Sequence, residues 1–364
     1  MLARIHIWIG LIAAVPWILQ GITGALLVFE RQLDAATNPS LFYVQPTEQR
    51  LNLDHQLAVV KRERPDLVNT AYGVDLTARP GYATMILAKP NSEAGPKEGT
   101  RLFVDPYRGV LLGTQSYRES LMGKVYNFHR TFYIEPWGKW ITSFSAILLM
   151  ASAATGFVLY FYRRRQRLMQ GRLYRWHTRL GVWMAPMIFL IAFNGAFVTY
   201  RFMLVPLIYL IADGKIPEEM QKPIKIDIPP NASRITLERA LQIAEEAVPN
   251  ATNAVMTEPM NPKRPITVIR KKQNEPRELG GTFVLINPYT GQVMGINDFT
   301  DGSLGNRLTY LSIHLHTGQV GGYFGEGGRI ATQLLWLGTA LCIPLLAFFA
   351  IASRWKRRSK PSIS

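Results

Sequence analysis

Four long stretches with almost no charged residues constrain this chain more than any other feature of its sequence. They run from about Ile5 to Phe29, Ile141 to Tyr162, Leu180 to Ile211 and Ile330 to Ser353, with Arg201 interrupting the third. Each holds about 20 apolar residues or more, enough for a helix to cross the hydrocarbon core of a bilayer. A lone span in lipid has to be helical, because its backbone polar groups meet no water there. We therefore expect an integral membrane protein of helical class with four spanning helices.

Lysine and arginine gather beside these stretches, and the formal net charge is +16. One cluster follows the second stretch and another follows the fourth: Arg163, Arg164, Arg165, Arg167, Arg172, Arg175 and Arg179, then Arg354, Lys356, Arg357, Arg358 and Lys360. The positive-inside rule places both clusters and both termini in the cytoplasm and the two long loops outside. We expect a multi-pass protein of the bacterial inner membrane, with periplasmic modules and a lipid rather than a nucleic-acid partner. A cleaved signal peptide is the alternative for the first stretch, but its length and the lack of a clear cleavage site disfavour it.

The two halves of the chain share residues in one register. Arg4, His6, Gly10 and Gly24-Ala25 recur 171 positions later as Arg175, His177, Gly181 and Gly195-Ala196. The long loops also match, with Leu102-Phe-Val-Asp-Pro-Tyr-Arg-Gly109 in one and Val284-Leu-Ile-Asn-Pro-Tyr-Thr-Gly291 in the other. Each reads as a strand that enters a tight turn. The sequence therefore predicts two tandem repeats, each with a small α+β module.

Helices and strands of the modules follow from periodicity. Helices are expected over Thr236–Val248 and, more weakly, over Leu53–Arg64, and strands over Ile266–Arg270 and Tyr82–Leu87. The expected organisation is span 1 (1–30), module 1 (31–120), a surface helix with span 2 (121–163), a cytoplasmic loop (164–176), span 3 (177–211), module 2 (212–303), a surface segment with span 4 (304–354) and a cytoplasmic tail (355–364).

Five of the six histidines lie at a predicted membrane boundary, and only His55 lies within a module. His6 and His177 begin the first and third spans, whereas His129 and the pair His314/His316 precede the second and fourth. A histidine at a helix end can simply be an interfacial polar residue, but ionisable groups at this depth are costly and tend to be functional. We expect the histidines to meet in two pairs, one near each membrane surface.

Two facing imidazoles from different helices of a bundle suit a haem iron with two axial ligands. The single cysteine, Cys342, lies in an apolar stretch and excludes disulfides and thiolate clusters within one chain. Gly10 and Gly24 share a helix face with His6, and Gly181 and Gly195 share one with His177. Gly24 and Gly195 either leave a gap for the outer haem or allow close helix packing. His314 and His316 point about 200° apart on a helix, so one haem would use one of them.

In their order along the chain, these motifs resemble those of the PepSY-associated transmembrane family: the two modules with Asp/Asn-Pro-Tyr-x-Gly turns, the two His-x3-Gly segments, Phe128-His129-Arg130 and Leu315-His-Thr-Gly318. The likeness covers nearly the whole chain. One branch of that family resembles ferric-siderophore reductases with two haems. The resemblance implies His6 and His177 as ligands of an inner b-type haem, and His129 with His316 as ligands of an outer one.

The histidine pairs together with this resemblance imply electron transfer across the membrane to a periplasmic ferric siderophore, which would make the chain an oxidoreductase of iron uptake. The donor stays open between a flavin reductase and a quinol, because the chain has no fused flavin domain. Arg130 is expected to bind a haem propionate or a lipid phosphate. Around the outer site, Phe128, Phe132 and Tyr133 are expected anchors, whereas Trp137, Trp140, Tyr323 and Arg329 line the mouth or form an interfacial belt. The alternatives are a haem-free PepSY binding or regulatory protein, and a siderophore permease component.

Overall fold

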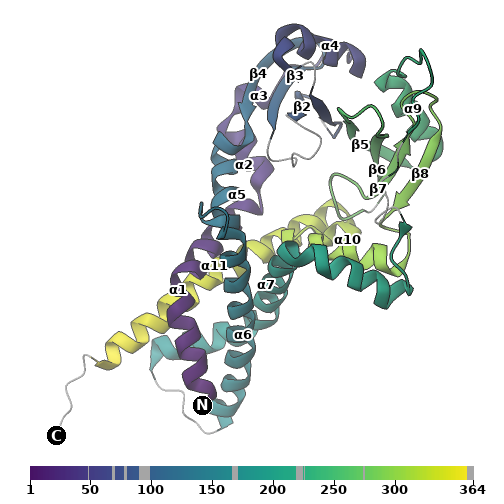
Figure 1. Cartoon of the computed structure of the whole chain (residues 1–364). Coiled ribbons are helices and arrows are strands. Elements are labelled where there is room, and N and C mark those ends of the chain that lie inside the picture. The colour runs from purple at the N-terminus through teal and green to yellow at the C-terminus, as the bar shows by residue number, and fades with distance from the viewer. Residues whose placement is uncertain are drawn as a thin grey trace, which may run out of the picture.

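The computed structural model describes residues 1–358 except 48, 68–69, 78–79, 90–98, 166–170, 219–223, 225 and 274. Arg167 and Lys360 of the basic clusters lie outside these residues. Within the described residues, four helices are long and apolar enough to cross a membrane, namely α1 (Leu2–Leu27), α6 (Gly138–Arg165), α7 (Arg172–Asp213) and the segment Val320–Trp355, which joins η3 (Val320–Phe324) to α11 (Gly325–Arg358). They form a bundle, and the N-terminus and the end of α11 both lie on the side away from the sheet (Figure 1). The four predicted spans are thus confirmed as membrane-capable helices, and α7 is longer than a single crossing requires.

Outside the bundle, the strands that the structure describes form one antiparallel sheet of eight in the order β4-β3-β2-β1-β5-β6-β7-β8. The first half supplies β1 (Ala71–Asp75), β2 (Thr84–Lys89), β3 (Thr100–Asp105) and β4 (Val110–Ser116). The second supplies β5 (Ala251–Glu258), β6 (Ile266–Lys272), β7 (Thr282–Ile286) and β8 (Val293–Asp298). The halves join where β1 pairs with β5, with Tyr72 opposite Glu258. The two predicted modules therefore share one continuous sheet.

Two amphipathic helices, α4 (Leu53–Glu63) and α9 (Leu237–Ala247), cover one face of this sheet. Alternate strand residues such as Ile86, Leu102 and Val284 pack beneath them and are fully buried, as the period of two in a strand requires. Each helix also caps the other. Asp54 accepts hydrogen bonds from the backbone of Leu237 (3.0 Å) and Glu238 (3.1 Å), and the Glu238 carboxylate accepts one from Leu53 N (3.2 Å). Acidic groups at helix N-termini satisfy free N–H groups and favour the helix dipole.

The two predicted strand-turns form in the same way. The Asp105 side chain accepts from the backbone N–H groups of Tyr107 and Arg108, and the Asn287 side chain from those of Tyr289 and Thr290. Both turns close on a glycine at positive φ, +65° at Gly109 and +72° at Gly291, where L side chains are strained. Both strand-turns therefore have the geometry that their turn residues predict.

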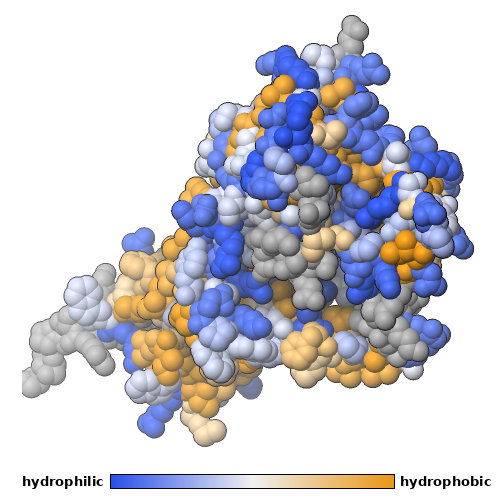
Figure 2. Space-filling model, turned by 45° about the horizontal axis from the view of Figure 1, so that its top comes forward, coloured by the Kyte–Doolittle hydropathy of each residue, from blue (hydrophilic) through white to orange (hydrophobic). Residues whose placement is uncertain are grey.

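Short helices connect the sheet to the bundle. The small helices α2 (Glu30–Thr37), α3 (Pro39–Phe42) and η1 (Pro65–Leu67) belong to the first half. From the edge strand β4 the chain passes through η2 (Tyr117–Glu119) into α5 (Leu121–Thr131) and then α6. From the opposite edge strand, β8, it passes into α10 (Leu304–Thr317), η3 and α11. Figure 2 shows apolar side chains gathered over the helical part and polar ones over the sheet, as expected if lipid surrounds only the bundle.

Candidate functional site

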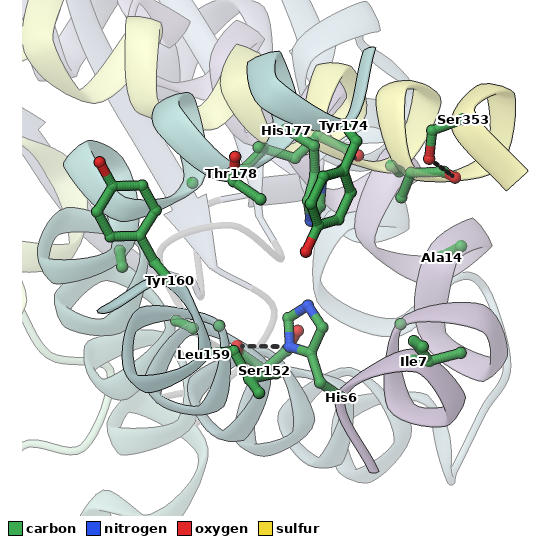
Figure 3. A pocket seen from close by; sticks show the side chains of 18 of the residues that line it. His6, Ile7, Ala14, Ser152, Leu159, Tyr160, Tyr174, His177, Thr178 and Ser353 are labelled. Atoms are coloured by element: carbon green, nitrogen blue, oxygen red, sulfur yellow. Dashed lines mark hydrogen bonds between the residues drawn. The ribbon is translucent and has the colours of Figure 1, made fainter. Parts of the chain in front are cut away.

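One pair of histidines, the far pair, lies at the end of the bundle away from the sheet. His6 comes from α1 and His177 from α7, and their ring centroids are 6.3 Å apart with an interplanar angle of 63°. Figure 3 shows the two rings directed into the same space from opposite sides. The residues that the sequence placed at equivalent ends of two spans therefore face each other.

Hydrogen bonds fix the tautomer of both far rings. His6 Nδ1 lies 3.2 Å from the Ser152 carbonyl and 3.1 Å from Thr155 Oγ1, and His177 Nδ1 lies 3.0 Å from the Leu346 carbonyl. A carbonyl oxygen only accepts, so Nδ1 of each ring is the donor. The lone pair then resides on Nε2. Both rings thus have the protonation state in which neutral imidazole binds a metal.

The far pair opens into a cavity of about 480 Å³ between all four long helices. Its walls are largely apolar and include Trp17, Gly10 and Gly181. Arg163 and Arg354 line it as well, and Arg163 donates a 2.6 Å hydrogen bond to the hydroxyl of Tyr174. A concave apolar space with a few polar groups is the usual form of a cofactor site, and this volume lies within the usual range.

The second pair, the near pair, lies at the end of the bundle next to the sheet. His129 comes from α5 and His316 from α10, and their centroids are 6.4 Å apart with an interplanar angle of 43°. His129 Nδ1 is 2.9 Å from Thr23 Oγ1, and His316 Nδ1 is 3.3 Å from the Ile191 carbonyl. The Thr23 hydroxyl donates its own proton to the Leu19 carbonyl at 2.7 Å, so it presents a lone pair to the ring. All four paired histidines therefore donate from Nδ1.

Glycines explain how these rings come so close to the helices. A Cβ added to Gly24 would lie 3.3 Å from His129 Cε1, and one added to Gly195 would lie 3.2 Å from His316 Cε1. The space that Gly24 and Gly195 leave therefore holds an imidazole ring. Close packing between α1 and α11 instead occurs at Gly21, where an added Cβ would lie 2.8 Å from the Ala340 carbonyl oxygen on α11.

The same arrangement recurs at His6, where a Cβ added to Gly156 would lie 2.9 Å from His6 Cε1. In this case and at Gly195, the carbonyl that accepts from Nδ1 belongs to the residue four positions earlier, Ser152 or Ile191. The ring rests on the glycine and reaches the carbonyl one turn back. We call this combination a glycine seat.

His314 faces away from the near pair. Its ring packs against Tyr310 with centroids 4.2 Å apart, its side chain is buried, and neither ring nitrogen has a hydrogen-bond partner in the described part of the chain. Burial, together with the nearby Arg277, lowers the pKa of His314 to about 3. The structure thus brings His316, and not His314, opposite His129. His55 lies on α4 and bonds to Asn52.

Other predicted residues lie around the near pair without converging on it. Arg130 is exposed at the end of α5. Phe128 packs against Phe132 and Tyr133.

Among the residues predicted to line the mouth, Trp137 is 65% exposed, and Trp140 contacts Tyr200 and Lys139. Arg329 pairs with Glu326 and donates to Gln333, while Tyr323 is exposed.

Sequence reasoning missed Thr23, Thr155 and Gly156, which contact the histidine rings. Thr23 directly precedes Gly24, and Thr155 directly precedes Gly156. A polar residue beside a glycine inside an apolar span was the available signal, because polar groups in lipid need a partner. The second half has Asn194-Gly195 at the position of Thr23-Gly24, so the signal occurs in both halves.

Among the described residues, no three His, Cys, Asp or Glu side chains gather into a group that could hold a bare metal ion. The histidines instead form pairs, which suits a cofactor with four equatorial ligands of its own. A search of curated proteins finds no match to the chain. A family model described as the PepSY-associated TM region matches residues 3–358. The chain therefore belongs to the PepSY-associated transmembrane family, whose match spans both halves of the bundle and the sheet between them.

Proposed function

We propose that this protein transfers electrons across a membrane with two b-type haems and reduces a ferric chelate, such as a ferric siderophore, on the side that carries the sheet. His6 and His177 would hold one haem, and His129 and His316 the other. The observation that supports this most directly is the two ring pairs, each built from two helices, with Nδ1 as the donor in all four rings.

The spacing of the rings fits a shared metal ion. Two metal–nitrogen bonds of about 2 Å, plus about 1 Å from nitrogen to ring centre on each side, separate opposed imidazole centroids by about 6 Å. The observed separations are 6.3 Å and 6.4 Å. Histidine ligands also normally donate their second ring nitrogen to an oxygen acceptor, which orients the ring and raises its basicity. Both properties of the pairs support the proposal.

At the far pair, the remaining cavity residues fit the proposed haem. Apolar side chains, including Trp17 and Ile343, would keep water away from the macrocycle. Arg163 and Arg354 are suited to bind its propionates by charge-assisted hydrogen bonds. Gly10 and Gly181 have no side chain that would project from the helix beside the histidines. In the described part of the chain, no atom outside the neighbouring helix backbone lies within 4 Å of a Cβ added to Gly10.

Two histidines at each site would hold a haem in the form that supplies one-electron transfer rather than oxygen binding. The overall reaction moves one electron from a donor on the far side to the Fe(III) of the chelate, which becomes Fe(II). The softer and less charged Fe(II) is held less tightly by oxygen ligands, so the chelate releases it for transport.

The same proposal includes an orientation in the bacterial inner membrane. Basic residues such as Arg163, Arg175 and Arg354 lie at the far end of the bundle, which the positive-inside rule assigns to the cytoplasm. The sheet would then be periplasmic. The two halves also share an element order, with a helix, four strands, a short helix that carries a histidine and a long helix, which favours tandem repeats.

A pyridine haemochrome assay on the purified full-length protein tests the proposal. We expect about two haems per chain, and about one in His6→Ala and in His129→Ala, because each change removes one axial ligand. His55→Ala is the matched control and should retain both haems. His55 lies on α4, which packs on the sheet, and it bonds to Asn52. A colourless wild-type protein would refute the electron-transfer function and leave a binding or regulatory role.

Substrate reduction needs its own measurement. The protein in nanodiscs would be reduced under anaerobic conditions and mixed with a ferric hydroxamate chelate, while the haem spectrum and ferrous iron are followed together. We expect equal amounts of oxidised haem and of Fe(II) captured by a ferrous-specific dye. Two haems that stay reduced in excess chelate would contradict the assignment of ferric hydroxamates as substrates.

A further inference from the structure

Two threonines inside the apolar helices accept hydrogen bonds from histidine rings. Thr23 lies on α1 and Thr155 on α6, and each hydroxyl donates its proton to the carbonyl four residues earlier, at 2.7 Å to Leu19 O and 2.7 Å to Ala151 O. A hydroxyl has one proton and two lone pairs. Because the backbone takes the proton, a lone pair is left for the ring.

The ring atoms that receive these lone pairs are the Nδ1 atoms of the paired histidines. Thr23 Oγ1 is 2.9 Å from His129 Nδ1, and Thr155 Oγ1 is 3.1 Å from His6 Nδ1. Both rings come from the first half of the chain. Their partners in the second half, His177 and His316, use backbone carbonyls instead. Side-chain changes can therefore alter one histidine in each pair and leave its partner untouched.

We infer that Thr23 and Thr155 are positioning residues. Thr23 holds His129 in the tautomer with Nδ1 protonated, and both threonines set the strength of their histidine ring as a metal ligand. Without the Thr23 hydroxyl, the neutral His129 ring can move its proton to Nε2, and that nitrogen then lacks the lone pair that a metal requires. The hydrogen bond also donates electron density through the ring, which favours Fe(III) over Fe(II) and lowers the reduction potential.

The two threonines act at different ends of the bundle. Loss of the Thr23 hydroxyl changes the near pair, and loss of the Thr155 hydroxyl changes the far pair. At His6 the Ser152 carbonyl still accepts, at 3.2 Å, so Thr155→Val leaves that ring with a partner. The tautomer is a property of the protein itself, whereas the change in potential rests on the proposed function.

The first test uses the full-length protein without haem, with 15N-labelled histidine rings, because ring nitrogen shifts distinguish the two tautomers. We expect His129 to be protonated at Nδ1 in the wild type and to become a mixture of tautomers in Thr23→Val, with recovery in Thr23→Ser. Thr339→Val is the matched control, since Thr339 is buried in α11 and its hydroxyl bonds to the Leu335 carbonyl. An unchanged His129 tautomer in Thr23→Val would overturn the inference.

The second test uses the haem-loaded protein and redox titration of each haem spectrum. Thr23→Val should raise the midpoint potential of the near haem and leave that of the far haem unchanged. Thr155→Val should raise the midpoint potential of the far haem and leave that of the near haem unchanged. Two bound haems with unshifted potentials would overturn the role in ligand strength while the electron-transfer proposal stands. A wild-type protein that binds no haem would end that proposal, and the tautomer measurement would still decide the role of the threonines.

Discussion

If the proposed haems bind at the two histidine pairs, replacement of Gly24 by leucine should remove the near haem and leave the far one. The Cβ added at this position already lies 3.3 Å from His129 Cε1, and carbon–carbon contacts are optimal at about 3.5–4.0 Å. Alanine therefore requires the ring to shift by only a few tenths of an ångström. Leucine adds three more carbons beyond Cβ, so the ring has to retreat by about 1 Å or more. Metal–ligand distances tolerate only about 0.2 Å.

The assay is the haem content of purified variants, combined with spectra that separate the two haems. We expect about two haems per chain in Gly24→Ala and about one in Gly24→Leu. Gly338→Leu on α11 is the control and should keep both haems, because among the described residues no atom outside the neighbouring helix backbone lies within 4 Å of a Cβ at Gly338. Two haems with unaltered spectra in Gly24→Leu would refute the idea that His129 needs the space beside Gly24 in order to act as a ligand. Loss of haem in the control would show that leucine in these helices disturbs folding generally.

Three further outcomes follow from the same structure. Gly156→Leu should remove the far haem alone, measured by the same assay, since its Cβ would lie 2.9 Å from His6 Cε1. Asp34→Ala should lower the free energy of unfolding by about 3–5 kcal/mol, because it leaves Arg101 buried without its carboxylate partner; Asp34→Ala combined with Arg101→Met should cost clearly less in the same denaturation experiment. Burial raises the pKa of Glu275 from 4.5 to about 7, so the folded state binds the extra proton and stability should fall by at most about 3 kcal/mol as pH rises from 4.5 to 7. The melting temperature of Glu275→Gln, measured at several pH values, should change less between pH 4.5 and 7 than that of the wild type. An equal change in both proteins would exclude this carboxyl as the cause.

Local chemistry accounts for what the sequence predicted well. Spanning helices need only a run of apolar residues, and the turns at Asp105 and Asn287 need only a side-chain acceptor ahead of a glycine. The histidine pairs were predictable because the order of spans places equivalent helix ends side by side. These features depend on neighbours in the chain or on topology, both of which the sequence displays.

Contacts between distant segments account for what the sequence left open. Nothing local to β1 or β5 indicates that they pair across the two halves, because an edge strand can pair with any other edge. The choice between His314 and His316 depends on which face of α10 meets α7, which the spacing of two residues does not determine. Thr23 was visible as a polar residue in an apolar span, but its partner lies 106 positions away.

The edges of the sheet lead directly into the helices that carry the near histidines. β4 continues through η2 into α5 with His129, and β8 continues into α10 with His316, while β1 and β5 join the two halves at the centre. The sheet therefore connects the two short helices that carry the near pair. We expect a partner that changes the curvature of the sheet to change the distance between His129 and His316 without contacting either ring.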